Sequence, residues 1–209
     1  MKSQSNLATR FSLQRGVDFE KEQQRREWGL RALSGRLVEL SAQEGSASIT
    51  MAATLIRQAQ LQGEVAVWIG LDSSCFFPPD MARCGVDLDH LPVMRLPQTR
   101  AIPIAADLLV RCGSFALLVL DLGADVNLPL STLTRLAGLA KHHDTALVLL
   151  TEKPRNAPSL GSLVSVRAEV VRRDLGNGRF ACEVRVLKDK SQGLPSKHTE
   201  LRRGPDGLH

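Results

Sequence analysis

Several residue types that mark particular classes of protein are scarce or missing in this sequence. Tyrosine is absent and aromatic residues make up only 4% of the chain, whereas 43% of the residues are hydrophobic, so we expect an aliphatic core. The cysteines form no C-x-x-C pair and have no histidine at metal-ligand spacing. These absences argue against a metal site and a disulfide framework, and they predict reduced thiols at Cys75, Cys84, Cys112 and Cys182.

Long apolar segments are missing as well. Residues 1–31 contain no run that resembles a signal peptide, and no stretch has the roughly 20 apolar residues of a membrane-spanning helix. We therefore expect a cytoplasmic protein with no membrane partner. The formal net charge of +5 and the pI near 9.3 are compatible with nucleic acid or an acidic partner, but also with ordinary solubility.

The length of 209 residues fits one substantial α/β domain with an extension. We divide the chain into a polar N-terminal arm, residues 1–34, and a core, residues 35–209. Between its last two aromatic residues the arm has no apolar position, so a helix there would lack a continuous apolar stripe. Two interpretations stay open: a solvated arm, or a helix that docks on a partner or on a second copy. The candidate docking residues are Phe19, Arg25, Arg26, Trp28 and Arg31.

The following region alternates buried strands with amphipathic helices. Continuous apolar runs, which are typical of strands buried on both faces of a parallel sheet, predict strands at 36–40, 65–69, 115–121 and 146–150. Apolar residues at helical spacing predict helices at 48–61, 102–112 and 131–142. Within them we expect Leu108 and Leu109 to face inward and Ser131 to cap its helix. A short helix at 80–84 and a short strand at 91–96 complete this region.

From residue 164 onward apolar and polar residues alternate, as in antiparallel strands with one solvated face. The pattern predicts a hairpin of residues 164–172 and 180–187, joined through Gly176-Asn177-Gly178, where Asn-Gly tolerates the positive φ of a tight turn. A further edge strand is expected at 200–202. The predicted fold is α/β: a mostly parallel central sheet flanked by helices, with a C-terminal antiparallel β-hairpin.

The turn between the first strand and the first helix has the architecture of a phosphate-binding loop without its functional residues. In the template G-x-x-x-x-G-K-[ST], glycines let backbone N–H groups surround the phosphates, the lysine contacts them and the hydroxyl holds Mg²⁺. On residues 42–49 the glycine positions carry Ala42 and Ala47, the lysine position Ser48 and the hydroxyl position Ile49. We therefore expect neither ATP hydrolysis nor a bound cofactor.

Five short segments resemble the RecA recombinase core, in that family's order and over roughly residues 33–207. They are residues 35–40, 85–91, 117–121, 165–173 and 184–190. The resemblance implies a RecA-like fold in which Asp121 matches the acid that ends the second nucleotide-binding strand. It also implies that Asp72 lies near the position of the catalytic glutamate and Glu152 near that of the nucleotide-sensing glutamine. We interpret all three, with Ser48 and Ile49, as vestigial, and Asp121 as structural.

The resemblance also implies two DNA-binding loops, after Asp121 and after Glu152. The first is nearly absent, and the second is shortened to residues 153–162, so filament-type DNA binding is not expected. Two interpretations of the nearby basic residues stay open: weak contact with phosphates, or a solvated basic surface, since a few such contacts bind weakly and depend on salt. The residues are Lys153, Arg155, Arg172 and Arg173.

Among RecA-like chains without a working phosphate loop, the sequence resembles the ImuA-type mutagenesis accessory proteins. This resemblance implies a role in the bacterial DNA-damage (SOS) response. The chain would bind a Y-family polymerase-like partner and support an error-prone replicative-type polymerase in translesion synthesis. Two alternatives stay open: a single-stranded-DNA-binding regulator of recombination, and a SulA-type cell-division inhibitor.

Overall fold

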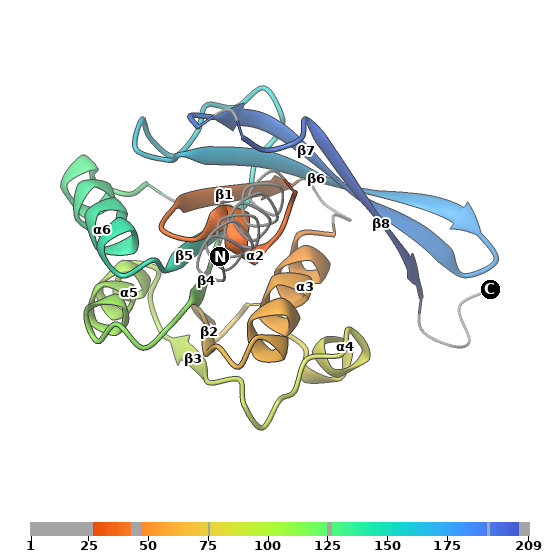
Figure 1. Cartoon of the computed structure of the whole chain (residues 1–209), viewed down its shortest axis with the longest axis horizontal. Helices are drawn as coiled ribbons and strands as arrows, with labels where there is room; N and C mark the ends of the chain where they lie inside the picture. The colour runs from red at the N-terminus through yellow and green to blue at the C-terminus, as the bar shows by residue number, and fades with distance from the viewer. Residues whose placement is uncertain (1–26, 43–46, 75, 125–126, 192, 205–209) are drawn as a thin grey trace, which may run out of the picture.

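The computed structural model describes residues 27–42, 47–74, 76–124, 127–191 and 193–204, which form an eight-stranded mixed sheet flanked by helices (Figure 1). The strands are β1 Leu37–Ala42, β2 Ala66–Leu71, β3 Val93–Leu96, β4 Leu117–Gly123, β5 Ala146–Glu152, β6 Val166–Gly176, β7 Arg179–Asp189 and β8 Lys197–Arg203. The helices are α2 Leu30–Leu33, α3 Ser48–Leu61, α4 Pro78–Arg83, α5 Ala101–Arg111 and α6 Leu130–His142.

The sheet has a parallel part and an antiparallel part. Its strand order is β3-β2-β4-β5-β1-β6-β7-β8. Every pairing from β3 to β6 is parallel, and β7 and β8 extend the sheet with antiparallel pairings. The predicted fold class is therefore confirmed. The hairpin turns at Asn177, whose φ of 53° lies in the left-handed region that Asn tolerates.

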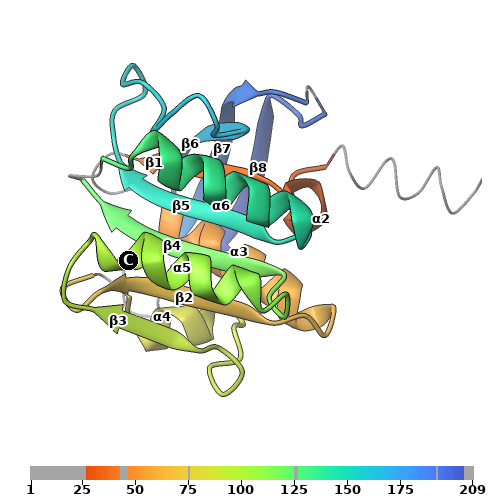
Figure 2. The same ribbon diagram turned by 90° about the vertical axis from the view of Figure 1, so that its left-hand side faces the viewer.

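Helices cover both faces of the parallel part, so its strands are buried on both sides. Figure 2 shows α5 and α6 in front of the sheet and α3 behind it. Neighbouring residues of β2 face the two layers in turn: Trp68 packs in the layer under α3, whereas Ile69 packs in the layer under α5 and α6. This double burial explains the continuous apolar runs in the sequence.

Two details of the helices differ from the sequence-based prediction. Leu108 is 65% exposed rather than inward-facing. In α5 the buried residues Ile102, Ala106 and Val110 follow one another at four-residue spacing, and Leu108 lies on the opposite side of that stripe. The expected cap at Ser131 is wrong as well, because α6 begins one residue earlier, at Leu130, and its N-cap is Pro129.

The end of the predicted arm packs against the core. Trp28, Leu30 and Leu33 are all buried in the layer that contains α3, and the Leu30 amide donates a hydrogen bond of 2.9 Å to Gln58 Oε1. Trp28 is therefore not an exposed docking residue, because its indole ring is part of this chain's own core. Arg31 is exposed beside Gln62. The candidates Phe19, Arg25 and Arg26 lie outside the described residues, and the division at residue 34 stays a prediction.

The described ranges contain neither a membrane-spanning helix nor a cluster of metal-ligating residues. No helix there is long and apolar enough to cross a membrane. No group of three or more His, Cys, Asp or Glu residues in those ranges is placed to hold a metal ion. Cys84, Cys112 and Cys182 are free thiols, of which Cys182 is buried.

Candidate functional site

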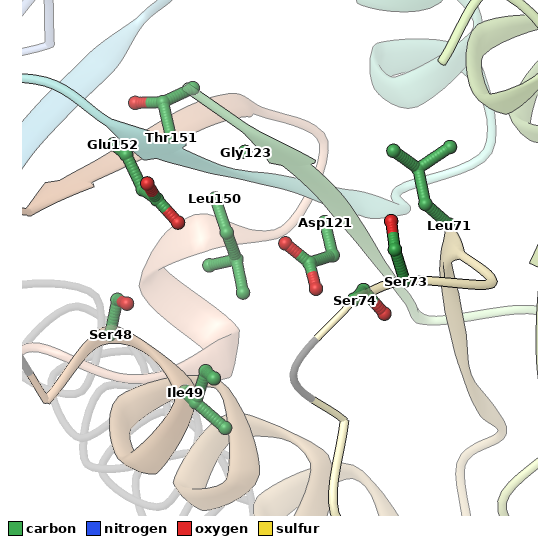
Figure 3. A pocket seen from close by; sticks show the side chains of 10 residues that line it. All are labelled: Ser48, Ile49, Leu71, Ser73, Ser74, Asp121, Gly123, Leu150, Thr151 and Glu152. Carbon is green, nitrogen blue, oxygen red and sulfur yellow. The ribbon is translucent and has the colours of Figure 1, made fainter. Parts of the chain in front are cut away.

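A pocket lies where the carboxyl ends of β4 and β5 meet the start of α3 and the loop after β2 (Figure 3). Its volume is about 240 Å³. In parallel α/β sheets this is the edge at which ligands bind. The polar side chains that line the pocket come from Ser48, Ser73, Ser74, Asp121, Thr151 and Glu152.

The pocket brings together positions that the phosphate-loop template and the RecA resemblance singled out in the sequence. Ser48 and Ile49, at the template positions of the lysine and the metal-binding hydroxyl, are the first two residues of α3 and line the pocket. In Figure 3 the side chain of Leu150 lies between those of Glu152 and Asp121. The described residues that line the pocket include no lysine, arginine or histidine. Its charged side chains are therefore two acids without a basic neighbour in the lining.

Asp121 shows how this environment treats negative charge. Burial raises the pKa of its carboxyl group, a hydrogen bond from the Ser74 hydroxyl lowers it, and the charge of Glu152 raises it, with a net upward shift. The approach of Ser74 depends on Gly70, because a Cβ there would lie 2.8 Å from Ser74 Oγ and 3.3 Å from Asp121 Cβ. A polyphosphate would add negative charge where a single carboxylate is already disfavoured.

Asp72 does not join this group. It is exposed in the turn after β2, where its amide donates to the Leu96 carbonyl at 3.1 Å and its own carbonyl accepts from Arg95. The structure thus brings together four of the five predicted vestigial positions, namely Ser48, Ile49, Asp121 and Glu152. It adds Ser73 and Ser74, which no sequence motif indicated.

A second carboxylate, Glu39 of β1, lies close by with very different surroundings. It is 0% exposed, and its Oε1 lies 3.1 Å from Lys153 Nζ. Its other oxygen accepts hydrogen bonds of 2.9 Å from the Ser159 hydroxyl and from the Leu160 amide. Thr151 completes the set with a bond of 3.3 Å. Every partner comes from the end of β5 or the loop that follows it.

Arg167 of β6 contacts the same loop. Its side chain is 5% exposed and donates hydrogen bonds to the carbonyl oxygens of Ala157 and Pro154. Glu39 and Arg167 are neighbours in the register of β1 and β6. Glu39 and Arg167, which have opposite charges, therefore both attach the loop at residues 153–162 to the sheet. Glu39 was not among the site residues predicted from the sequence, although a charged residue inside an otherwise apolar strand was a signal that could have identified it.

The four predicted phosphate-contacting residues do not form one surface. The side chain of Lys153 is only 17% exposed because its ammonium group pairs with the buried Glu39. Lys153 therefore has an internal role: it offsets the charge of Glu39. Arg155 is exposed on the loop. Arg172 lies over the Phe180 ring at 4.4 Å, whereas Arg173 pairs with Glu183 at 3.2 Å. As consecutive residues of β6, these two arginines point to opposite faces of the sheet.

The fold and the pocket define a class: an α/β protein with a mostly parallel sheet, in which the start of α3 lies beside a pocket at the carboxyl edge. No family model matches the chain. A 90-residue segment is 43% identical to the RecA protein of Corynebacterium efficiens and 42% identical to that of Leifsonia xyli subsp. xyli. An 89-residue segment is 37% identical to the RecA protein of Chloroflexus aurantiacus.

These matches cover 42% of this chain and between 22% and 24% of the three RecA proteins, so the chain spans about a quarter of their length. With the mixed sheet and its antiparallel end, they show that the chain contains a RecA-like core.

Proposed function

We propose that this chain is a non-catalytic RecA-like accessory protein of the bacterial DNA-damage response. It docks with a Y-family polymerase-like partner and so supports an error-prone replicative-type polymerase in translesion synthesis. The observation that carries the non-catalytic part is the pocket beside α3, which has Asp121 and Glu152 but no basic residue among the described side chains of its lining.

The charge balance of that pocket opposes nucleotide binding. A nucleoside triphosphate needs cationic side chains or a metal ion to offset its phosphates, as the lysine and hydroxyl of an intact loop provide. Here Ser48 carries no positive charge at the lysine position and Ile49 has no hydroxyl at the metal-binding position. Burial raises the pKa of Asp121, which indicates that negative charge is already disfavoured in the pocket. The retained strand and helix thus serve as scaffold.

A titration with Mg-ATP tests this part of the proposal. A ligand at 100 times its Kd stabilises the folded state by about 2.7 kcal/mol, which raises the melting temperature measurably. We expect no change up to millimolar Mg-ATP, whereas a RecA protein with an intact loop is stabilised under the same conditions. Stabilisation of the wild-type chain, abolished by Asp121→Ala, would overturn the non-catalytic interpretation.

Association with the polymerase-like partner tests the remaining part. The structure defines the deletion to use: removing residues 1–26 leaves Trp28, Leu30 and Leu33 in the core, whereas a deletion to residue 34 would remove them. If the arm docks, the shorter deletion abolishes co-purification with the partner and leaves the melting temperature unchanged. The docking role would be refuted if the wild-type chain bound neither the Y-family polymerase-like partner nor the error-prone replicative-type polymerase at micromolar concentrations.

A further inference from the structure

The two edge strands of the sheet differ in their capacity to accept another strand. β3 has four residues and is bounded by Pro92 and Pro97, which cannot donate a backbone hydrogen bond. β8 has seven residues without proline and pairs with β7 along its whole length, from Arg203 beside Arg179 to Lys197 beside Arg185. No described residue pairs with its other side, and Figure 1 shows it at the rim of the sheet.

The hydrogen-bonding pattern shows which backbone groups of β8 point outward. The Val186 amide donates to the Ser196 carbonyl at 2.9 Å, and the Gly204 amide donates to the Gly178 carbonyl at 2.7 Å. Because hydrogen-bonded and non-hydrogen-bonded pairs alternate in an antiparallel ladder, the even-numbered residues of β8 bond to β7. The backbone N–H and C=O groups of Lys197, Thr199 and Leu201 therefore point away from the sheet.

The side chains of β8 point alternately to two faces of the sheet. One face contacts α3, and the other, which we call the available face, is not covered by any helix of the described residues. His198, Glu200 and Arg202 hydrogen-bond to one another or to Thr54 of α3, so they stabilise the fold. Lys197, Thr199 and Leu201 belong to the other face, on the side of the sheet where α5 and α6 lie. Figure 1 shows those helices far from β8. Leu201 is 75% exposed there.

The available face is positively charged. Glu183 of β7 is 3% exposed and has three cations around it: Arg185 at 3.0 Å, Lys197 at 3.1 Å and Arg173 at 3.2 Å. Glu169 also lies 3.7 Å from Arg185, so two carboxylates offset two of these three positive charges. Arg179 and Arg203 lie directly opposite each other at the end of the same face and add two further basic side chains to it.

A second copy of this chain is a poor occupant of the edge. Antiparallel pairing of two β8 strands about their centres would set Glu200 beside Glu200 and Lys197 beside Arg203, so like charges would meet. An acidic segment meets opposite charges instead. Nucleic acid would use the cations but neither the outward N–H and C=O groups nor Leu201, since its affinity comes chiefly from phosphate contacts.

We propose that the free edge of β8 binds an extended acidic segment of the protein partner by β-strand addition. Main-chain hydrogen bonds to Lys197, Thr199 and Leu201 supply part of the affinity, acidic side chains face Lys197 and Arg203, and an apolar side chain covers Leu201. The inference rests on the proposed function, since it names the surface that the protein partner uses.

Amide hydrogen exchange of the full chain tests the inference with defined probes. The probes are a nine-residue peptide that alternates Asp and Val, the same peptide with Lys in place of Asp, and a 20-nucleotide oligothymidylate. We expect the acidic peptide alone to slow exchange at the outward amides of Thr199 and Leu201 at least tenfold. Three results would overturn the inference. The basic peptide could protect these amides as well as the acidic peptide does, the amides could be protected without any probe because the chain self-associates, or the oligonucleotide alone could bind.

Thr199→Pro and Thr199→Val form a matched pair of variants. Because the Thr199 amide points outward, proline removes a docking hydrogen bond without removing one to β7. We expect Thr199→Pro to weaken binding of the acidic peptide and of the polymerase-like partner at least tenfold, and Thr199→Val less than twofold. The melting temperature of each variant verifies folding, and Lys197→Glu serves as a second variant that leaves the backbone unchanged.

The two proposals fail in different ways. If the polymerase-like partner binds wild type and Thr199→Pro equally well, the edge of β8 is not its docking site and the proposed function stands. If the partner does not bind the wild-type chain at all, the proposed function fails.

Discussion

Glu39 and Asp121 lie at nearly the same height on the parallel sheet, beside Leu149 and Leu150 of β5, but the chain treats these two carboxylates differently. Glu39 is fully buried and has a lysine, two hydroxyls and an amide as partners. Asp121 is partly buried, has the Ser74 hydroxyl as a partner, and lies near the like charge of Glu152. A buried charge is stable where the chain itself supplies its partners. Where the chain supplies fewer partners and a like charge lies near, as at Asp121, the charge is disfavoured.

Removing the satisfied carboxylate has the largest expected effect. Glu39→Ala leaves Lys153 without its carboxylate partner and frees Ser159 and Leu160 from the sheet. We expect a loss of about 3–5 kcal/mol in the free energy of unfolding, as for other broken buried ion pairs. Urea denaturation measures it. A loss below about 1 kcal/mol would show that the network around Glu39 contributes little.

Lys153 and Arg155 are basic residues of the same loop, but only Lys153 pairs with Glu39. Lys153→Met leaves Glu39 with its neutral donors but without a cation, so we expect a loss of about 2–3 kcal/mol. Arg155→Met is the matched control, because Arg155 is exposed on the same loop and its replacement should change stability by no more than about 0.5 kcal/mol. Denaturant titrations that give equal values for both variants would contradict the internal role of Lys153.

A third carboxylate, Asp189, extends the comparison to acid pH. Burial alone would raise its pKa, but hydrogen bonds from the Leu194 amide, Arg36 and Ser191 lower it from 3.8 to about 2. A depressed pKa contributes stability above pH 3.8 that is lost as the pH falls toward 2. We expect Asp189→Asn to be less stable than wild type by about 2 kcal/mol at pH 7. Thermal melts should show this difference shrinking between pH 4 and pH 2.

Neutralising Asp121 has the smallest expected effect on the free energy of unfolding, and the effect is a gain rather than a loss of stability. A raised pKa means that wild-type stability decreases as the pH rises from 3.8 through the folded-state pKa of Asp121, which burial raises above that value. Asp121→Asn lacks this decrease. We expect it to match wild type near pH 3 and to exceed it at pH 7, by no more than about 1 kcal/mol. Destabilisation at pH 7 in thermal melts would show that the charge of Asp121 stabilises the fold.

The sequence predicted most of the fold because local patterns decide it. Double burial produced the continuous apolar runs of β2, β4 and β5, and Gly176-Asn177-Gly178 marked the turn of the hairpin. Leu108 was misjudged because apolar character alone does not indicate which side of a helix meets the sheet. The packing of α5 on the sheet decided that position.

The site was predicted less completely because its partners are far apart in the chain. The phosphate-loop template identified Ser48 and Ile49, which are consecutive residues. Lys153 was interpreted as a surface cation, since no local pattern connects it with Glu39, 114 positions earlier. Ser73 and Ser74 enter the pocket because of the path of the loop after β2, which the sequence does not specify.

The central position of β1 has a consequence for the order of events during synthesis. β1 is made first, yet its two neighbours are β5 and β6, which begin at Ala146 and Val166. A nascent chain that ends before residue 146 therefore carries β1 with both edges unpaired, a state prone to aggregation. Completion of the sheet must await the last third of the chain, so we expect stalled or truncated products to be prone to aggregation.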